Sequence, residues 1–188
     1  MEYPLNTLGL AHKFIAEHVS PGDICIDATA GNGGDTEFLC RLVGDSGRVI
    51  AIDIQERAVL KTRARLHEKG LYHIAEVLCD SHSNIKNYAE PETVSAVMFN
   101  LGWLPGGDHS VFSTADTTIP AIEGALELLR PSGVMSICIY YGRDCGYEER
   151  DRLLEYLPTI DSKKYTVIVS NFVNRQGDVP IPVFIIKQ

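Results

Sequence analysis

A glycine-rich loop with an acidic residue at each end is the segment of this sequence best suited to hold a ligand. It runs from Asp27 through Gly31, Asn32 and Gly33 to Asp35, between an apolar run and a helical pattern. Glycines there allow positive φ angles and let a ligand approach the backbone closely. In an open α/β sheet, ligands bind beyond the carboxyl ends of strands. The loop is therefore predicted to be the cofactor site.

The charges of the loop indicate which cofactor it holds. A pyrophosphate would bind the free N–H groups at the helix N-terminus, but Asp35 lies in that first turn and repels a phosphate. Asp27 adds a second negative charge, and Thr36 replaces the third glycine of the dinucleotide fingerprint. A ligand with an ammonium group and a sulfonium suits these charges, which predicts S-adenosyl-L-methionine. The alternative for Asp35 is a helix cap.

A second polar position follows the apolar run 48–54. Asp53 stands about twenty positions past the loop, where an acidic residue accepts the ribose hydroxyls of a bound nucleotide. Dinucleotide enzymes and methyltransferases share this feature, so Asp53 predicts a nucleoside without choosing between them. Gln55 contacts the same ribose or simply begins the next helix.

Three more polar residues follow the run 74–79, namely Asp80, Ser81 and His82. At the end of the third strand, these residues are placed to meet the exocyclic amine and ring edge of an adenine. For His82, the alternative is a residue that begins the next helix.

The run 94–100 ends in Asn100 and a turn rich in proline and glycine, which suits a polar group held at a sheet edge. In amino-methylating enzymes, a strand-end Asn and the next backbone carbonyl, here that of Leu101, accept hydrogens from the target nitrogen. This aims the nitrogen lone pair at the methyl group. Because the leaving thioether is neutral, in-line positioning is the main contribution of the protein.

Three further residues of the same turn have two interpretations each. Trp103 forms an aromatic wall for a flat substrate or anchors the packing of the loop. Asp108 and His109 form an acid/base pair that removes an amine proton, or they are a hydrogen-bonded turn.

Residues suited to nucleic acid occur near the end of the fifth strand and in the last turn. Tyr141 can stack on a base and Arg143 can meet a phosphate, while Asn174 and Arg175 add to a local basic patch. The lysines at 163–164 are expected to be a solvated surface. A net charge of −8 argues against a protein that grips long nucleic acid through phosphates alone.

The elements that position these residues alternate along the chain. Apolar runs typical of buried strands lie at 23–28, 48–54, 74–79, 94–100 and 133–141. Helical patterns lie at 8–18, 35–43, 55–69, 116–130 and 147–157. Such alternation predicts an α/β fold, with a parallel sheet covered on both faces.

The final two strands, 164–173 and 179–186, break this rhythm. The turn between them is too short for a crossover helix, so they must be antiparallel. The prediction is a seven-stranded, mostly parallel sheet with a C-terminal antiparallel hairpin. This is the Rossmann-like layout of class I methyltransferases.

The bulk properties predict a single domain over residues 1–188, since the sequence has no linker or break in composition. No apolar run approaches the ~20 residues of a membrane span, and no secretory leader is evident. A cytoplasmic protein is expected. Cys25, Cys79 and Cys138 lie in apolar runs and are expected to be reduced and structural.

Several sequence blocks together resemble one family. They are DATAGNGGDT, AIDIQ, CDSHSN, FNLGWLPGGDH, TTIPAIE, IYYG and GYEE. The chain resembles, from Leu8 to its final strand, the Firmicute-type proteins labelled rRNA methylases. The resemblance implies a class I methyltransferase and a homodimer, with the tRNA anticodon stem-loop as partner. It also implies methylation of the amine of wobble 5-aminomethyl-2-thiouridine to 5-methylaminomethyl-2-thiouridine.

The same resemblance implies roles for individual residues. Asn100 and the Leu101 carbonyl would face the target amine, while Thr29 stands where the general methyltransferase loop has its first glycine. The residues that would contact the cofactor are Asn32, Asp35, Asp53, Gln55, Ser81 and His82.

Three alternatives remain open at this point. The first is a ribosomal RNA methyltransferase, as the family label suggests. The second is a small-molecule methyltransferase, favoured by the acidic net charge. The third is a nucleotide-binding module without activity, which leaves the turn after Asn100 unexplained.

The cofactor prediction can be checked by isothermal calorimetry. The protein should bind S-adenosylhomocysteine and should not bind NAD, because the loop carboxylates repel a pyrophosphate. Binding of NAD with comparable affinity would contradict the interpretation of Asp35.

Overall fold

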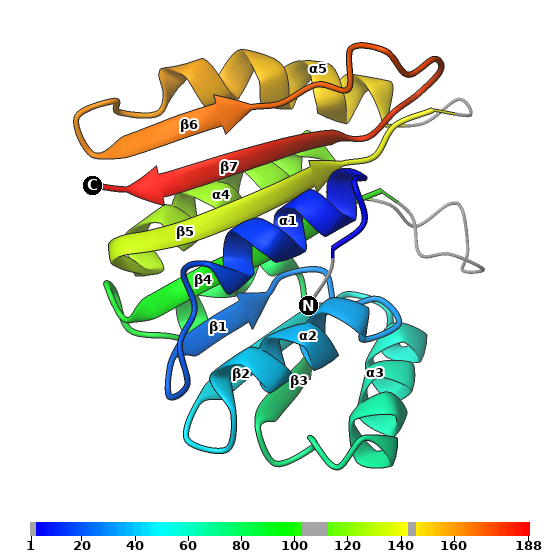
Figure 1. Cartoon of the computed structure of the whole chain (residues 1–188), viewed down its shortest axis with the longest axis vertical. Coiled ribbons are helices and arrows are strands. Elements are labelled where there is room, and N and C mark those ends of the chain that lie inside the picture. The colour runs from blue at the N-terminus through cyan, green and yellow to red at the C-terminus, as the bar shows by residue number, and fades with distance from the viewer. Residues whose placement is uncertain (1–2, 103–112, 143–145) are drawn as a thin grey trace.

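The computed structural model describes residues 3–102, 113–142 and 146–188. Over these residues the chain forms one seven-stranded sheet in the order β3-β2-β1-β4-β5-β7-β6 (Figure 1). The strands are β1 (Ile24–Asp27), β2 (Arg48–Asp53), β3 (Ala75–Cys79), β4 (Val94–Leu101), β5 (Leu129–Ile139), β6 (Tyr165–Val169) and β7 (Ile181–Lys187). β1 to β5 pair in parallel, whereas β7 runs antiparallel to both β5 and β6. The predicted fold class is confirmed.

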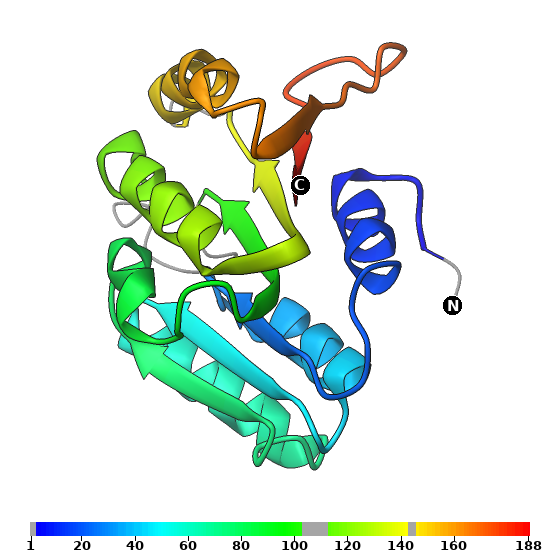
Figure 2. The same cartoon turned by 90° about the vertical axis from the view of Figure 1, so that its left-hand side faces the viewer.

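Helices cover both faces of this sheet (Figure 2). They are α1 (Thr7–Ala16), α2 (Gly34–Val43), α3 (Glu56–Glu68), η1 (His82–Asn87), α4 (Ala115–Leu128), α5 (Tyr147–Tyr156) and η2 (Leu157–Thr159). α1, α2 and α3 bury their apolar residues in one cluster with the sheet, while η1, α4 and α5 bury theirs in another. Among the described residues, no helix is long and apolar enough to cross a bilayer.

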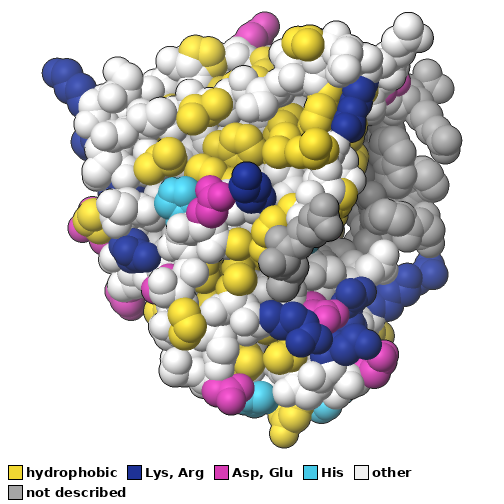
Figure 3. Space-filling model, viewed as in Figure 1, with side chains coloured by type: hydrophobic (Ala, Val, Ile, Leu, Met, Phe, Trp, Pro, Cys, Tyr) yellow, Lys and Arg dark blue, Asp and Glu magenta, His cyan; other side chains and the backbone are white. Residues whose placement is uncertain are grey.

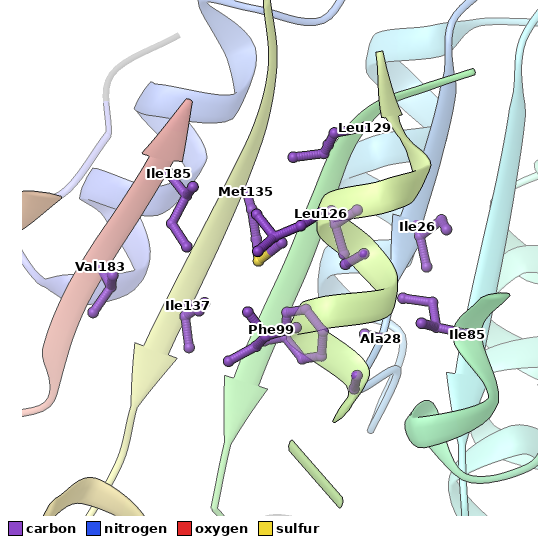
Figure 4. Packing of buried hydrophobic residues seen from close by; sticks show 14 of the residues in the cluster. Ile26, Ala28, Ile85, Phe99, Leu126, Leu129, Met135, Ile137, Val183 and Ile185 are labelled. Carbon is purple, nitrogen blue, oxygen red and sulfur yellow. The ribbon is translucent and has the colours of Figure 1, made fainter. Parts of the chain in front are cut away.

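β4 shows why its sequence is a nearly continuous apolar run. Val97, Phe99 and Leu101 belong to the cluster under α4, and Ala96 and Met98 belong to the cluster under α1 and α2. Successive side chains of a strand point to opposite faces, so a strand covered on both sides must be apolar at every position. Figure 4 shows Phe99 packed beside α4, with Ile137 of the next strand near it.

The order of the strands fixes where a ligand can bind. From β1 the chain moves to β2 and β3 on one side, and β4 then pairs with β1 on its other side. The connections after β1 and β4 therefore diverge at the carboxyl edge of the sheet. Such a switch point leaves a crevice between loops.

Two local expectations were wrong. The strand predicted over 164–173 ends at Val169, and Val173 is 94% exposed. Cys79 is exposed instead of buried, since it ends β3, the edge strand of the sheet. Cys25 and Cys138 are buried as expected. An apolar pattern does not distinguish an edge position from a central one.

Ile137→Ala is expected to lower the free energy of unfolding by about 2–5 kcal/mol, because it leaves a cavity beside α4. Ile137 is 1% exposed. Ile168→Ala is the matched control on edge strand β6, where the side chain is 44% exposed, and should cost about 1 kcal/mol or less. Urea unfolding measures both values. Equal losses would contradict the assignment of the core.

Candidate functional site

A cavity of about 750 Å³ lies at the carboxyl edge of the sheet, at the switch point. This volume is ample for a cofactor of nucleoside size. The predicted site residues that line it are Gly31, Asn32, Asp35, Asp53, Gln55, Ser81, His82, Asn100, Leu101 and Tyr141. Trp103, Asp108, His109 and Arg143 lie outside the described residues.

Asp53 ties the end of β2 to the loop after β1. Its Oδ2 accepts from the Gly31 backbone N–H at 2.8 Å, and its Oδ1 accepts from the Gln55 N–H at 2.9 Å. Burial raises the pKa of this carboxyl. Each carboxylate oxygen keeps acceptor capacity, so Asp53 can also accept ribose hydroxyls at the cavity wall.

Asp27, which the sequence predicted to contact the cofactor, lies behind the loop and does not line the cavity. It is fully buried, accepting from the Thr36 hydroxyl at 2.6 Å and from the Thr29 N–H at 3.2 Å. Burial, and then the charge of Asp35, raise the pKa of Asp27. Asp27 thus shapes the loop from within.

Gly33 is also a structural residue of the loop and does not line the cavity. It precedes α2 with φ of 78°, a left-handed conformation that favours glycine. A Cβ there would lie 3.0 Å from the Thr62 Cα. Gly33, which the sequence predicted to bind the cofactor, thus lets the loop pack closely against α3.

His82 stands where an adenine ring is expected. Its ring meets the Phe99 ring edge-on, with centroids 6.0 Å apart. Its Nε2 is buried and has no hydrogen-bond partner among the described residues. Burial lowers the pKa of His82 to about 4, so the ring is neutral near pH 7. A neutral ring with one unpartnered nitrogen suits a ligand that fills the cavity.

Asp80, which the sequence predicted to meet the adenine amine, does not line the cavity. Its carboxylate accepts from the Tyr88 hydroxyl, from Asn84 Nδ2 at 2.9 Å and from the Ser81 N–H at 2.7 Å. The hydrogen bond from Tyr88 is the largest of the effects that lower the pKa of Asp80. Asp80 therefore organises the start of η1, and Ser81 and His82 face the cavity.

Asn100 connects the end of β4 to both sides of the cofactor loop. Its backbone N–H donates to the Thr29 hydroxyl at 2.7 Å, and its Nδ2 donates to Asp35 Oδ2. The side-chain Oδ1 is buried with no partner among the described residues. Leu101 lines the cavity too, although its carbonyl already accepts from the Tyr140 N–H at 3.2 Å.

A partly buried network that sequence reasoning missed holds Gly102, the residue that follows β4. The Gly102 N–H donates to the Ser113 hydroxyl at 3.0 Å, and that hydroxyl donates to Glu149 Oε2 at 2.7 Å. Thr118 donates to Glu149 Oε1 at 2.6 Å. Burial raises the pKa of Glu149. The only signal in the sequence was the block GYEE, which contains Glu149.

The residues predicted to bind nucleic acid divide into two groups. Tyr141 lines the cavity, with the Arg150 guanidinium 4.6 Å from its ring centroid. Asn174 is exposed, and Arg175 donates to the Leu5 carbonyl and lies 4.0 Å from the centroid of the Phe172 ring. Neither Asn174 nor Arg175 lines the cavity.

Basic side chains on the face shown in Figure 3 gather near α2 and α3 instead. Arg41 and Arg65 there both pair with Glu37, at 2.8 and 2.7 Å. Lys61 donates to Asn32 Oδ1 at 3.1 Å, beside the cofactor loop. Of these three basic side chains, Lys61 contacts the cofactor loop, whereas both arginines pair with Glu37.

Among the residues that the structure describes, the aspartates of the cavity wall give it a negative charge. Asp35, Asp53 and Asp178 line it, and no lysine or arginine does. Sequence reasoning missed Asp178, which lies in the loop before β7 and accepts from the Tyr147 hydroxyl at 3.0 Å. Such a wall repels a pyrophosphate and suits a cationic ligand.

Comparison with known proteins agrees with this geometry. The model of the family described as "Putative rRNA methylase" matches residues 49–186. The chain belongs to this family. The resemblance inferred from the sequence blocks is confirmed, and the family is one of methyltransferases.

Several relatives of this methylase are similar over most of their length. The tRNA (mnm(5)s(2)U34)-methyltransferase of Arabidopsis thaliana chloroplasts is 32% identical, over 95% of this chain and 68% of that protein. A solved structure from Clostridium thermocellum, under the same description as the family, is 43% identical, covers 100% of both chains and has a TM-score of 0.96. A methyltransferase-type protein from Streptococcus mutans, solved with SAH, is 34% identical, covers 98% of this chain and 99% of its own, and has a TM-score of 0.89.

The depressed pKa of His82 predicts a specific pH dependence of stability. Between its ordinary value of 6.5 and about 4, the unfolded chain binds a proton at His82 that the folded methylase does not. Stability should therefore fall as the pH drops from about 6.5 to 4. His82→Phe should lose less stability over this window. Urea unfolding at several pH values measures the difference.

Exposed His67 provides the matched control for this experiment, because phenylalanine can keep its stacking on the Tyr72 ring. His67→Phe should follow the wild-type profile. The prediction is wrong if His82→Phe and wild type lose stability in parallel between these pH values.

Proposed function

We propose that this methylase is an S-adenosyl-L-methionine-dependent N-methyltransferase of tRNA. It methylates the amine of wobble 5-aminomethyl-2-thiouridine to give 5-methylaminomethyl-2-thiouridine. The observation that carries the proposal is the buried, unpartnered Oδ1 of Asn100 at the wall of a cavity lined by carboxylates. An amine N–H is the kind of donor that this oxygen lacks.

The residues present fit the methyl donor. The unpartnered Nε2 of His82 would meet the adenine, Asp53 and Gln55 would hold the ribose, and Asn32 and Asp35 would hold the amino-acid portion. When bound, S-adenosyl-L-methionine supplies an electrophilic methyl group on a sulfonium. The relative from Streptococcus mutans that was solved with SAH supports this choice.

The chain's own contribution to the reaction is to orient the amine. Asn100 Oδ1 accepts one amine hydrogen, so that the nitrogen lone pair points away from the oxygen and toward the donor. The Leu101 carbonyl has a second lone pair that can accept another hydrogen. Asp35 and Asp178 attract the positive charge that the nitrogen carries as it gains a methyl group. Burial of the site excludes water that would compete for these contacts.

An anticodon base can enter this site at a small cost in free energy. A wobble base is already unpaired in the loop of its tRNA, so little energy is needed to turn it into a cavity. Tyr141 at the cavity wall offers a ring for stacking. The chloroplast relative, which is named for a wobble nucleoside, supports tRNA over the ribosomal RNA of the family description.

The proposal also covers the domain organisation, the oligomeric state, the compartment and the RNA partner of the enzyme. Residues 1–188 form a single methyltransferase domain that works as a homodimer in the cytoplasm and binds the anticodon stem-loop. The family resemblance is the support for the dimer and the stem-loop.

Nucleoside mass spectrometry of total tRNA from cells that lack the gene tests the substrate. The unmethylated 5-aminomethyl nucleoside should accumulate in these cells. An unchanged tRNA profile would contradict the proposal, and loss of a methyl group from ribosomal RNA alone would favour the family's older description.

Complementation of the same cells with variants tests the role of Asn100. Asn100→Ala should restore less than about 10% of the methylated nucleoside, because misplacing a reactant can cost about 100-fold in rate. Its affinity for S-adenosylhomocysteine, measured by calorimetry, should stay close to that of wild type. Asn87→Ala, an exposed asparagine at the end of η1, should restore the nucleoside fully. Loss of cofactor binding in Asn100→Ala would contradict its role.

A further inference from the structure

α1 brings a histidine into contact with Asp35, a residue of the cavity wall. His12 Nε2 lies 2.6 Å from Asp35 Oδ1, and the His12 side chain is only 20% exposed. Its ring stacks on the Phe38 ring of α2, with centroids 4.0 Å apart and planes 12° from parallel. Stacking on one face and a hydrogen bond at one nitrogen leave this imidazole little freedom to turn.

Asp35 stands between this histidine and Asn100. Its Oδ1 meets His12, its Oδ2 accepts from Asn100 Nδ2, and the residue is only 8% exposed. Three side chains from α1, α2 and β4 therefore form one chain of hydrogen bonds. Each end of the Asp35 carboxylate is held by a different element of the fold.

The hydrogen bonds from His12 through Asp35 fix the orientation of the Asn100 side-chain amide. An asparagine amide has a donor nitrogen and an acceptor oxygen, and only the nitrogen can lie beside a carboxylate oxygen. With Nδ2 fixed on Asp35, the unpartnered atom is Oδ1. If the Asp35 carboxylate turned, the amide would lose the contact that fixes its orientation.

We propose that His12 is a positioning residue for methyl transfer. It holds the Asp35 carboxylate in the orientation that keeps Asn100 Oδ1 directed at the substrate amine. The inference rests on the function proposed above and adds His12 of α1, which the sequence did not predict as a site residue. Stacking on Phe38 needs only an aromatic ring, whereas the contact with Asp35 needs the ring nitrogen.

Two substitutions separate the ring of His12 from its nitrogen. His12→Phe keeps an aromatic ring against Phe38 and removes the donor to Asp35. His12→Gln loses the stacking but places an amide donor near the position of Nε2. The matched control is His18→Phe. His18 follows α1 and has a similar arrangement, with Nδ1 2.8 Å from the Phe14 carbonyl and a ring 4.8 Å from the Phe14 ring.

Steady-state and single-turnover kinetics on tRNA from the deletion cells give the first readout. His12→Phe should lower kcat about 10- to 100-fold, with the KM for tRNA within about threefold of wild type. His12→Gln should recover kcat to within about fivefold, and His18→Phe should match wild type. A wild-type kcat in His12→Phe, or an equal loss in His12→Gln, would overturn the proposal.

A spectroscopic readout tests the positioning without any substrate. The side-chain amide signal of Asn100 in an ¹⁵N–¹H NMR spectrum is identified by its loss in Asn100→Ala. His12→Phe should shift this signal, while His12→Gln and His18→Phe should leave it in place. An unmoved signal in His12→Phe would overturn the proposal. If wild type methylates no RNA, the proposed function fails, and the NMR result still decides the role of His12.

Discussion

The hydrogen bonds of Asn100 join the end of β4 to the loop after β1, where the connections of these two paired strands diverge, and the site depends on this junction. The backbone N–H of Asn100 meets Thr29 after β1, and its amide meets Asp35 at the start of α2. A parallel sheet brings strand ends to one edge but does not by itself orient the side chains there. These two contacts fix the cofactor loop and the end of β4 relative to each other.

Electrostatics explains why a loop that looks like a dinucleotide site serves a different ligand. Asp35 and Asp53 lie at the cavity wall, and Asp27 is buried behind it with a raised pKa. Buried carboxylates are costly to keep charged, and here each accepts at least two hydrogen bonds. A cationic sulfonium and an amine reduce that cost, whereas a pyrophosphate would increase it. The charge of the loop therefore selects the chemistry that the fold performs.

Much of the fold could be predicted because apolar runs and their spacing are local properties. The runs that became β1, β2 and β4 are apolar at nearly every position, since helices cover both faces of the sheet. Cys79 and Val173 show where this reasoning fails. Both lie in apolar stretches, yet one ends an edge strand and the other lies in the hairpin loop. The exposure of Cys79 and Val173 depends on which elements pack against them, and the local sequence does not determine those neighbours.

The sequence by itself determined the class of fold, the cofactor loop and the polar residues at each strand end, because these depend on residue type and order. Tertiary structure decided which of those residues face the ligand. Asp27 and Asp80 carry the expected carboxylates but accept hydrogen bonds from Thr36 and Tyr88, and Gly33 packs closely against α3. It also brought His12 to Asp35, across 23 residues of sequence. The physical reason is that a side chain's direction and partners are set by packing between elements, which spacing along one chain does not encode.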